Sequence, residues 1–210
     1  MTLNLDLSNA LKIIQNAGLD DPRLGIADPA LQLQSIIDAL CHLSTHDGLT
    51  GLVNAGFFHT ILSKEVDRSL RTGRGCGLMV IDINDFKRIN DTFGHLAGDK
   101  SLQTVAAQMK RSLRAMDTAG RIGGDEFAVI LPECAPEDAV HTAKRIHSSL
   151  NLLKVDFTTD LCITISSGLA WITADKSLSS TDLLAEADRE MYRSKNSGSG
   201  ILCYKSLTAV

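Results

Sequence analysis

The sequence predicts an α+β fold, with helices packed on a central and mostly antiparallel sheet, closer to a ferredoxin-like than to a doubly wound arrangement. Three observations support this prediction. Helix-like and strand-like segments mix without strict alternation along the 210 residues. The nearly all-apolar run 77–83 carries an acid, Asp82, near its end and has the composition of a central strand. Gly123-Gly124 separates two short strand-like runs, which indicates a tight hairpin whose turn residues can need positive φ.

The composition limits the class of protein. Hydrophobic residues make up 44% of the chain and charged residues 22%, which suffices for a sizeable core. A formal charge of −4 with no basic block argues against binding nucleic acid by charge. No stretch reaches the roughly 18 to 20 apolar residues of a membrane span, and no secretory signal pattern opens the chain. Five cysteines without a C-x-x-C pair indicate reduced thiols, so a cytoplasmic location is expected.

Residues 1–43 are predicted to form a helical extension ahead of a domain that spans 44–210. Apolar residues recur in the extension at helical spacing in two sets, Leu3-Leu7-Leu11-Ile14 and Leu33-Ile36-Leu40-Leu43. Gly18 and Pro22 break the pattern between the two sets. The second set has the spacing of a coiled-coil seam but spans barely two heptads. Contact with a second copy and packing on the chain's own core are therefore both open for this helix.

The larger domain contains further predicted helices and strands. The helices cover about 58–70, 102–114, 136–150 and 183–191, and the strands cover 77–83, 127–131, 161–172 and 201–204. Pro136 followed by two acids suits a helix start, and Ser179 with Asp182 fits a capping box. The segment 84–100 is polar, with two phenylalanines and two glycines.

Three acids lie where this fold would bring them together. Asp82 is at the end of the central strand, and Asp125 and Glu126 are at the tip or first rung of the hairpin. Carboxylates gathered without basic neighbours repel one another, and a shared divalent cation resolves the repulsion. Mg²⁺ bound by one or two carboxylates and substrate phosphates would support phosphoryl or nucleotidyl transfer, with Lys87 and Lys195 neutralising phosphate charge. The alternative interpretation is that these acids only face solvent and have no catalytic or metal-binding role.

The motifs resemble those of the GGDEF diguanylate cyclase family. Gly123-Gly-Asp-Glu-Phe127 spells its signature, and the segments 47–54, 82–99 and 187–198 match further family motifs in order and spacing. The resemblance covers about residues 44–205. It implies a fold similar to the palm domain of nucleotidyl cyclases. It also implies condensation of two GTP into cyclic di-GMP with loss of two pyrophosphates.

The resemblance also implies roles for individual residues. The Mg²⁺ ligands, with Mn²⁺ as an alternative ion, would be Asp82, the Ile83 carbonyl, Asp125 and Glu126. Asp125 would act as general base for the ribose 3′-hydroxyl, Lys87 as transition-state stabiliser and Lys195 as a phosphate contact. The substrate-binding set would include Gly123, Gly124 and the guanine-reading pair Asn90 and Asp99. An amide and a carboxylate suit guanine because the carboxylate accepts from its N–H groups, so Asp99 favours GTP over ATP.

A second site and a dimer follow from the same resemblance. Arg114-Ala-Met-Asp117 matches the R-x-x-D pattern of an inhibitory site for the product, and Arg145 matches its additional arginine. Arg114 and Asp117, three residues apart at a helix end, can face the same way. A surface ion pair is the alternative for these residues. Because each domain would hold one GTP, the active species is expected to be a symmetric homodimer.

Three departures from the family pattern bear on activity. Ala55-Gly56 and Ser199 stand where arginines are common, and Asn84 replaces a common aspartate. A missing arginine removes a bidentate phosphate partner, so reduced nucleotide affinity is expected. A Mg²⁺-dependent cyclase is the leading hypothesis, because the metal ligands and base are all present. A catalytically weak or inactive domain acting as a cyclic di-GMP receptor is the alternative, and Asp99 disfavours a mixed cyclic dinucleotide.

Overall fold

The computed structural model of the chain describes residues 6–155, 161–172, 178–197 and 203–207, which form two compact units divided after Gly48. The first unit contains α1 (Ser8–Asn16) and α2 (Pro29–Thr45), which pack on each other through Ile14 and Ile36. The Asp28 carboxylate accepts from the Ala30 N–H and caps α2. The predicted N-terminal helices are thus present. Among the described residues, no helix combines the length and apolar composition needed to cross a bilayer.

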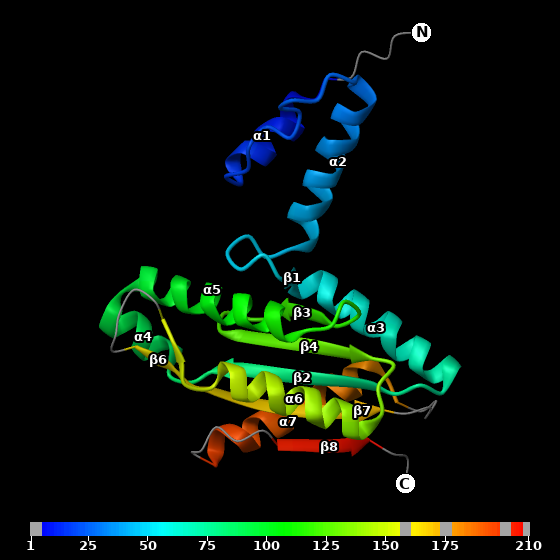
Figure 1. Cartoon of the computed structure of the whole chain (residues 1–210), viewed down its shortest axis with the longest axis vertical. Helices are drawn as coiled ribbons and strands as arrows, with labels where there is room; N and C mark the ends of the chain where they lie inside the picture. Colours follow the sequence, from blue (N-terminus) through cyan, green and yellow to red (C-terminus); the bar gives the residue numbers. More distant parts are fainter. Residues whose placement is uncertain (1–5, 156–160, 173–177, 198–202, 208–210) are drawn as a thin grey trace. The chain divides into compact units, whose positions relative to one another are not determined.

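The second unit is built on a six-stranded sheet (Figure 1). Its strands, in spatial order, are β1 (Val53–Asn54), β3 (Thr118–Arg121), β4 (Glu126–Pro132), β2 (Cys76–Ile83), β7 (Ile165–Ile172) and β8 (Cys203–Leu207). The outer pairs β1–β3 and β7–β8 are parallel, and the three inner pairs are antiparallel. A separate pair joins β5 (Leu153–Lys154) to β6 (Cys162–Ile163). The prediction of a mostly antiparallel α+β sheet is confirmed.

Helices cover both faces of the sheet (Figure 1). One face carries α4 (Phe86–Phe93), α5 (His95–Ser112) and α6 (Pro136–Leu150), and the other carries α3 (Ala55–Thr72) and α7 (Ser180–Asn196). All eight residues of β2 are buried. Met79 and Ile81 point into the first helical layer and Leu78 and Val80 into the second, as the alternation of strand side chains requires. The prediction of a central strand at 77–83 is therefore correct.

The segment expected only to be polar, 84–100, is helical throughout most of its length. It forms α4 and the first turns of α5, which Gly94 separates with a φ of +86°. The buried residue of α4 is Ile89, so a single apolar residue anchors a helix whose other face is polar. Such a short pattern gives little periodic signal. Similarly, the strand predicted at 161–172 is divided into β6 and β7 at Thr164.

Candidate active site

The acids of the sequence motifs meet at one end of the sheet. Asp82 on β2 lies directly opposite Glu126 on β4 in the antiparallel register, and Ser166 of β7 flanks it on the other side. The Ile83 N–H donates to the Asp125 carbonyl at 3.2 Å and so ties the hairpin to the end of β2. Asp82 is only 5% exposed. The β2–β4 pairing therefore brings together the three carboxyl residues that the sequence singled out.

A basic side chain also reaches this cluster. Lys195 Nζ of α7 donates to Asp82 Oδ1 at 2.8 Å, and this partner raises the lysine pKa. Helix α7 can approach the sheet closely because Gly168 of β7 has no side chain. A Cβ there would lie 2.1 Å from the Met191 N and 2.3 Å from the Ala187 carbonyl oxygen. The assumption that the acids lack a basic neighbour is wrong, because Lys195 pairs with one of them.

The electrostatics of the cluster favour a bound cation. Burial raises the pKa of Asp82, and Asp125 and Asp188 add to this effect while Lys195 opposes it. Burial also raises the pKa of Glu126, with further contributions from the charges of Asp82, Asp125 and Asp188. Ionisation of either carboxyl group therefore costs more free energy here than it does in water. A positive ion beside them would relieve this penalty.

Two side chains near Glu126 had no assigned role in the sequence prediction. Asp188 of α7 and His59 of α3 line a hollow of about 370 Å³ together with Glu126. The signal for Asp188 was its spacing of seven residues from Lys195, which places both on one face of a helix. His59 gave no comparable signal, because only the packing of α3 against the sheet brings it to this hollow.

The hairpin loop is held by its own backbone and by one arginine. Arg121 donates to the Gly124 carbonyl through Nη2 at 2.7 Å and Nε at 3.2 Å. The N–H groups of Ile122 and Gly123 both donate to the Glu126 carbonyl. Neither Gly123 nor Gly124 adopts a positive φ, so the expected reason for the two glycines is wrong. A Cβ on Gly123 would instead lie 2.4 Å from Glu126 Oε2, so this glycine makes room for the acid.

The predicted guanine-reading residues lie where α4 and α5 cross. Asn90 of α4 lies over Gly98 of α5, because a Cβ on that glycine would be 1.9 Å from Asn90 Oδ1. Asp99 follows Gly98 in α5 and is exposed. Lys87 is exposed in the first turn of α4, which begins three residues after the end of β2. These groups are therefore carried by the helix pair that immediately follows the acidic end of β2.

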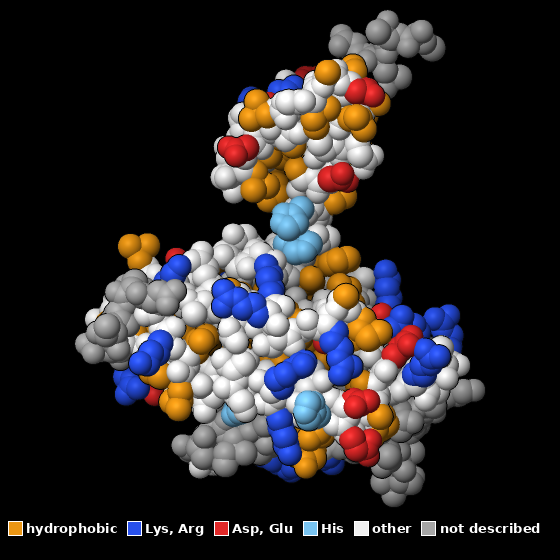
Figure 2. All heavy atoms as spheres, in the orientation of Figure 1, with side chains coloured by type: hydrophobic (Ala, Val, Ile, Leu, Met, Phe, Trp, Pro, Cys, Tyr) orange, Lys and Arg blue, Asp and Glu red, His pale blue; other side chains and the backbone are white. Residues whose placement is uncertain are grey.

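The predicted inhibitory residues gather beyond the end of α5. Asp117 and Arg114 close a turn, since the Arg114 N–H donates to Asp117 Oδ2 at 2.9 Å and the Asp117 N–H donates to the Arg114 carbonyl at 3.1 Å. The pair thus follows α5 rather than sharing a helix face, so the helical-spacing argument does not apply. Arg145 Nη2 of α6 donates to the Ser112 carbonyl at 3.0 Å. Figure 2 shows Lys and Arg side chains spread over α5 and α6.

Two of the three departures from the family pattern lie among the described residues. Asn84 Oδ1 accepts from Ser166 Oγ at 2.7 Å, and its Nδ2 donates to Thr164 Oγ1 at 3.3 Å, so this amide ties β2 to β7. Ala55-Gly56 begin α3 after Asn54, whose side chain accepts from the Phe57 N–H at 3.0 Å. Ser199 and the glycine before it lie outside the described residues.

The carboxylates at this end of the sheet fit a cation that binds together with a phosphate-bearing substrate. In the part of the chain that the structure describes, no three His, Cys, Asp or Glu side chains gather closely enough to hold a metal by themselves. Asp82 and Glu126 nevertheless face each other across β2 and β4 with raised pKa values. Mg²⁺ usually takes one or two carboxylates and completes its shell with water and phosphate oxygens. The residues present therefore suit Mg²⁺ bound jointly with a nucleotide.

Comparison with known proteins defines the class. The family described as "Diguanylate cyclase, GGDEF domain" matches residues 44–200, so the chain belongs to this family. It is 38% identical over 156 residues to the probable diguanylate cyclase DgcC of Escherichia coli K12, covering 74% of this chain and 42% of that protein. It is 40% identical over 154 residues to the diguanylate cyclase DgcP of Pseudomonas aeruginosa, covering 72% of this chain and 22% of that protein. The chain thus spans less than half of either relative.

Solved structures support the same assignment. The GGDEF domain of DgcB from Caulobacter crescentus in complex with c-di-GMP matches with a TM-score of 0.71 at 33% identity, covering 77% of this chain and 93% of that one. The coiled coil and GGDEF domain of the same protein, also in complex with c-di-GMP, matches with a TM-score of 0.76 at 27% identity. That match covers 95% of this chain and 100% of the other.

Proposed function

We propose that the chain is a diguanylate cyclase, which condenses two GTP into cyclic di-GMP and releases two pyrophosphates. One observation carries the proposal: Asp82, Asp125 and Glu126 meet at one end of the sheet, with Lys195 bound to Asp82. Paired carboxylates with an adjacent cationic side chain suit nucleotidyl transfer. Two relatives that match most of the chain are named as a probable diguanylate cyclase and a diguanylate cyclase.

In the proposed mechanism, Asp125 accepts the proton of the ribose 3′-hydroxyl, which then attacks the α-phosphate of the second GTP. Asp82, the Ile83 carbonyl, Asp125 and Glu126 would hold Mg²⁺, or Mn²⁺ in its place, and the ion would supply charge stabilisation at the phosphates. Lys195 would exchange part of its contact with Asp82 for a phosphate oxygen. Lys87 would stabilise negative charge that develops in the transition state.

Substrate choice would depend on the α4–α5 crossing. Asp99 would accept from the ring N–H and exocyclic amine of guanine, and Asn90 would complete the recognition through its amide. Adenine offers no matching pair of donors on this edge, which would leave the carboxylate without partners. The backbone of Gly123 and Gly124 would allow the nucleotide to approach the hairpin closely.

Two copies are required because each contributes one nucleotide. The proposed active species is a symmetric homodimer, with residues 1–43 as a regulatory or dimerisation segment. The match to a coiled-coil and GGDEF structure supports a dimer seam along α2. Cyclic di-GMP would inhibit the enzyme through Arg114, Asp117 and Arg145, because guanidinium groups pair with phosphates. A GTP-consuming protein with free thiols fits the cytoplasm.

The proposal is tested by separating the products of a reaction containing purified protein, GTP and Mg²⁺. Cyclic di-GMP is expected, and Asp125→Asn should reduce its formation by about 10²-fold or more, since general bases contribute this much. The exposed Asp138 of α6 offers a matched control, and Asp138→Asn should retain the parent rate. Tight binding of cyclic di-GMP without any turnover would instead favour the receptor function.

A further inference from the structure

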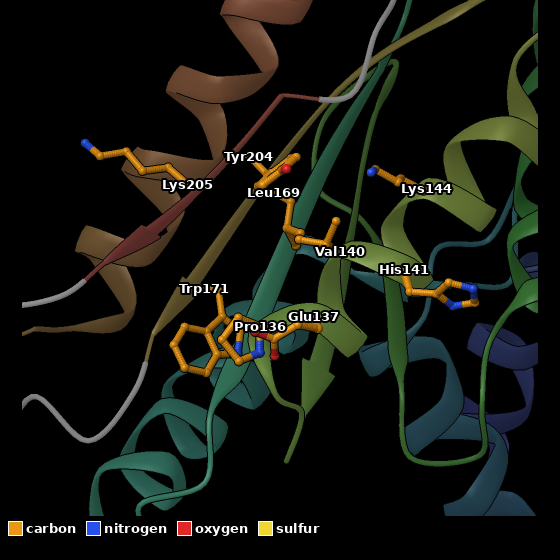
Figure 3. A pocket seen from close by; sticks show the side chains of 9 residues that line it. All are labelled: Pro136, Glu137, Val140, His141, Lys144, Leu169, Trp171, Tyr204 and Lys205. Carbon is orange, nitrogen blue, oxygen red and sulfur yellow. The ribbon is translucent and has the colours of Figure 1, made fainter.

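A groove outside the proposed active site lies between α6, β7 and β8 (Figure 3). Its volume is about 680 Å³, within the range of about 300–1,000 Å³ typical of small-molecule pockets. Val140 and Lys144 of α6 form one side, Leu169 and Trp171 of β7 form the floor, and Tyr204 of the edge strand β8 forms the other side. None of these residues belongs to the acidic cluster or to the proposed inhibitory site.

The surface of the groove is mainly apolar and aromatic. The Trp171 indole N–H donates to the Cys134 carbonyl at 3.0 Å, so the ring is fixed and its donor is already used. Leu169 is buried and lies beside Tyr204 in Figure 3, while Tyr204 is 54% exposed at the rim. The fixed indole in the floor and the tyrosine ring at the rim favour flat aromatic ligands, because stacking adds to the free energy gained by burying apolar area.

One end of the groove carries a positive charge. Lys144 Nζ lies 5.8 Å from the centroid of the Tyr204 ring, and Figure 3 shows its amino group directed toward that ring. Lys205 points the other way in Figure 3 and pairs with Glu186 at 3.0 Å. Within the described ranges, no salt bridge to Lys144 is found. An anion beside Lys144 would therefore displace no carboxylate that the structure describes.

The opposite end carries a negative charge. Glu137 lies beside Pro136 and Trp171 in Figure 3, so a second negative group on a ligand would meet a carboxylate there. The charge of the groove is thus asymmetric, with Lys144 near Tyr204 and Glu137 near Trp171. This asymmetry selects for a ligand with a single anionic group at one end.

We propose that this groove binds a small aromatic anion, with its ring between Trp171 and Tyr204 and its carboxylate or sulfonate beside Lys144. The inference does not depend on cyclase activity. It rests on the apolar floor that contains Trp171, the Tyr204 ring at the rim and Lys144, which lies over that ring at one end.

The test uses 1-anilinonaphthalene-8-sulfonate, an aromatic dye that carries one sulfonate and therefore belongs to the proposed class of ligand. Trp171 is the only tryptophan of the chain, so energy transfer from its fluorescence to the dye reports dye bound near it, and the lysine variants below test whether that dye lies in the groove. Saturable quenching of Trp171 is expected. Lys144→Gln should weaken the dye's affinity about tenfold, the loss expected for one charge-assisted contact. The exposed Lys154 of β5 provides the control, and Lys154→Gln should leave the affinity unchanged.

A neutral analogue separates the role of charge from that of apolar contact. N-phenyl-1-naphthylamine lacks the sulfonate, so Lys144→Gln should not change its affinity. Circular dichroism must show that each variant retains its fold. The proposal is overturned if Trp171 is not quenched in a saturable way. It is equally overturned if Lys144→Gln and Lys154→Gln bind the sulfonate with the same affinity.

Discussion

Gly168→Ala tests whether the approach of α7 to β7 positions the proposed active site. Gly168 lies in the middle of a buried strand, and its Cα faces the backbone of α7. The new methyl carbon would meet the Met191 N at 2.1 Å, the Ala187 carbonyl oxygen at 2.3 Å and the Glu190 carbonyl carbon at 2.6 Å. All three contacts are with helix backbone, so no side chain can rotate to relieve them.

The size of the expected effect follows from these distances. Ordinary van der Waals contact begins near 3.4 Å, so α7 would have to move outward by about 1 Å. Overpacking of this kind costs about 1–3 kcal/mol of unfolding free energy. The same movement would displace Lys195 from Asp82, and a misplacement of about 1 Å at a catalytic group can lower turnover by about 10²-fold.

Chemical denaturation and GTP turnover measure the two effects separately. Gly168→Ala should lower the denaturation midpoint and reduce turnover even under conditions in which the protein remains fully folded. Gly56→Ala is the control for stability, because a Cβ there meets only Asn54 Oδ1, at 3.8 Å. It should be neutral or slightly stabilising. If Gly168→Ala is as stable and as active as the parent protein, the account of α7 packing is wrong.

Three further predictions concern single side chains. Lys195→Met should reduce GTP turnover by about 10²-fold, because it removes a charge beside Asp82 and the proposed phosphate site. Arg114→Ala should weaken cyclic di-GMP binding at least about tenfold in calorimetry, whereas Arg111→Ala, on the same helix end, should not. Burial lowers the pKa of His147, so unfolding free energy should decrease as pH falls below about 6.5 toward the lower folded-state pKa, and His147→Gln should reduce this decrease.

Each of these predictions has an outcome that contradicts it. Undiminished turnover in Lys195→Met would remove that lysine from the site. Equal product affinity in Arg114→Ala and Arg111→Ala would show that the turn does not bind cyclic di-GMP. For the histidine, His141→Gln on the same helix is the control, because that side chain is exposed. A pH profile that changes equally in both histidine variants would exclude a special contribution from His147.

The sequence was sufficient to predict the central elements of the fold and the acidic cluster. The run 77–83 is buried on both faces, and a strand of that kind has an unbroken apolar composition. Asp82 and Glu126 become neighbours because β4, the second strand of the β3–β4 hairpin, also pairs antiparallel with β2. The strand and the hairpin depend on local pattern, which a single sequence contains, whereas the β2–β4 pairing was predicted only from the expectation that both strands are central.

Other features depend on contacts that the sequence does not display. Helix α4 was missed as a helix because Ile89 is its single buried residue. The turn at Asp117 replaces a helix end because its carboxylate binds the Arg114 backbone N–H. Gly123 serves the side chain of Glu126 rather than a positive φ. Each of these outcomes was decided by tertiary packing or by a side-chain contact with the backbone, so residue spacing alone could not predict it.

The stoichiometry of the reaction tests the proposed function most directly. Purified protein would be incubated with GTP and Mg²⁺, and pyrophosphate and cyclic di-GMP would be quantified over time in the same samples. Two pyrophosphates are expected for each cyclic di-GMP, and both products should be lost together in Asp82→Asn. Pyrophosphate release without a cyclic dinucleotide, or product formation that survives Asp82→Asn, would contradict the proposed function.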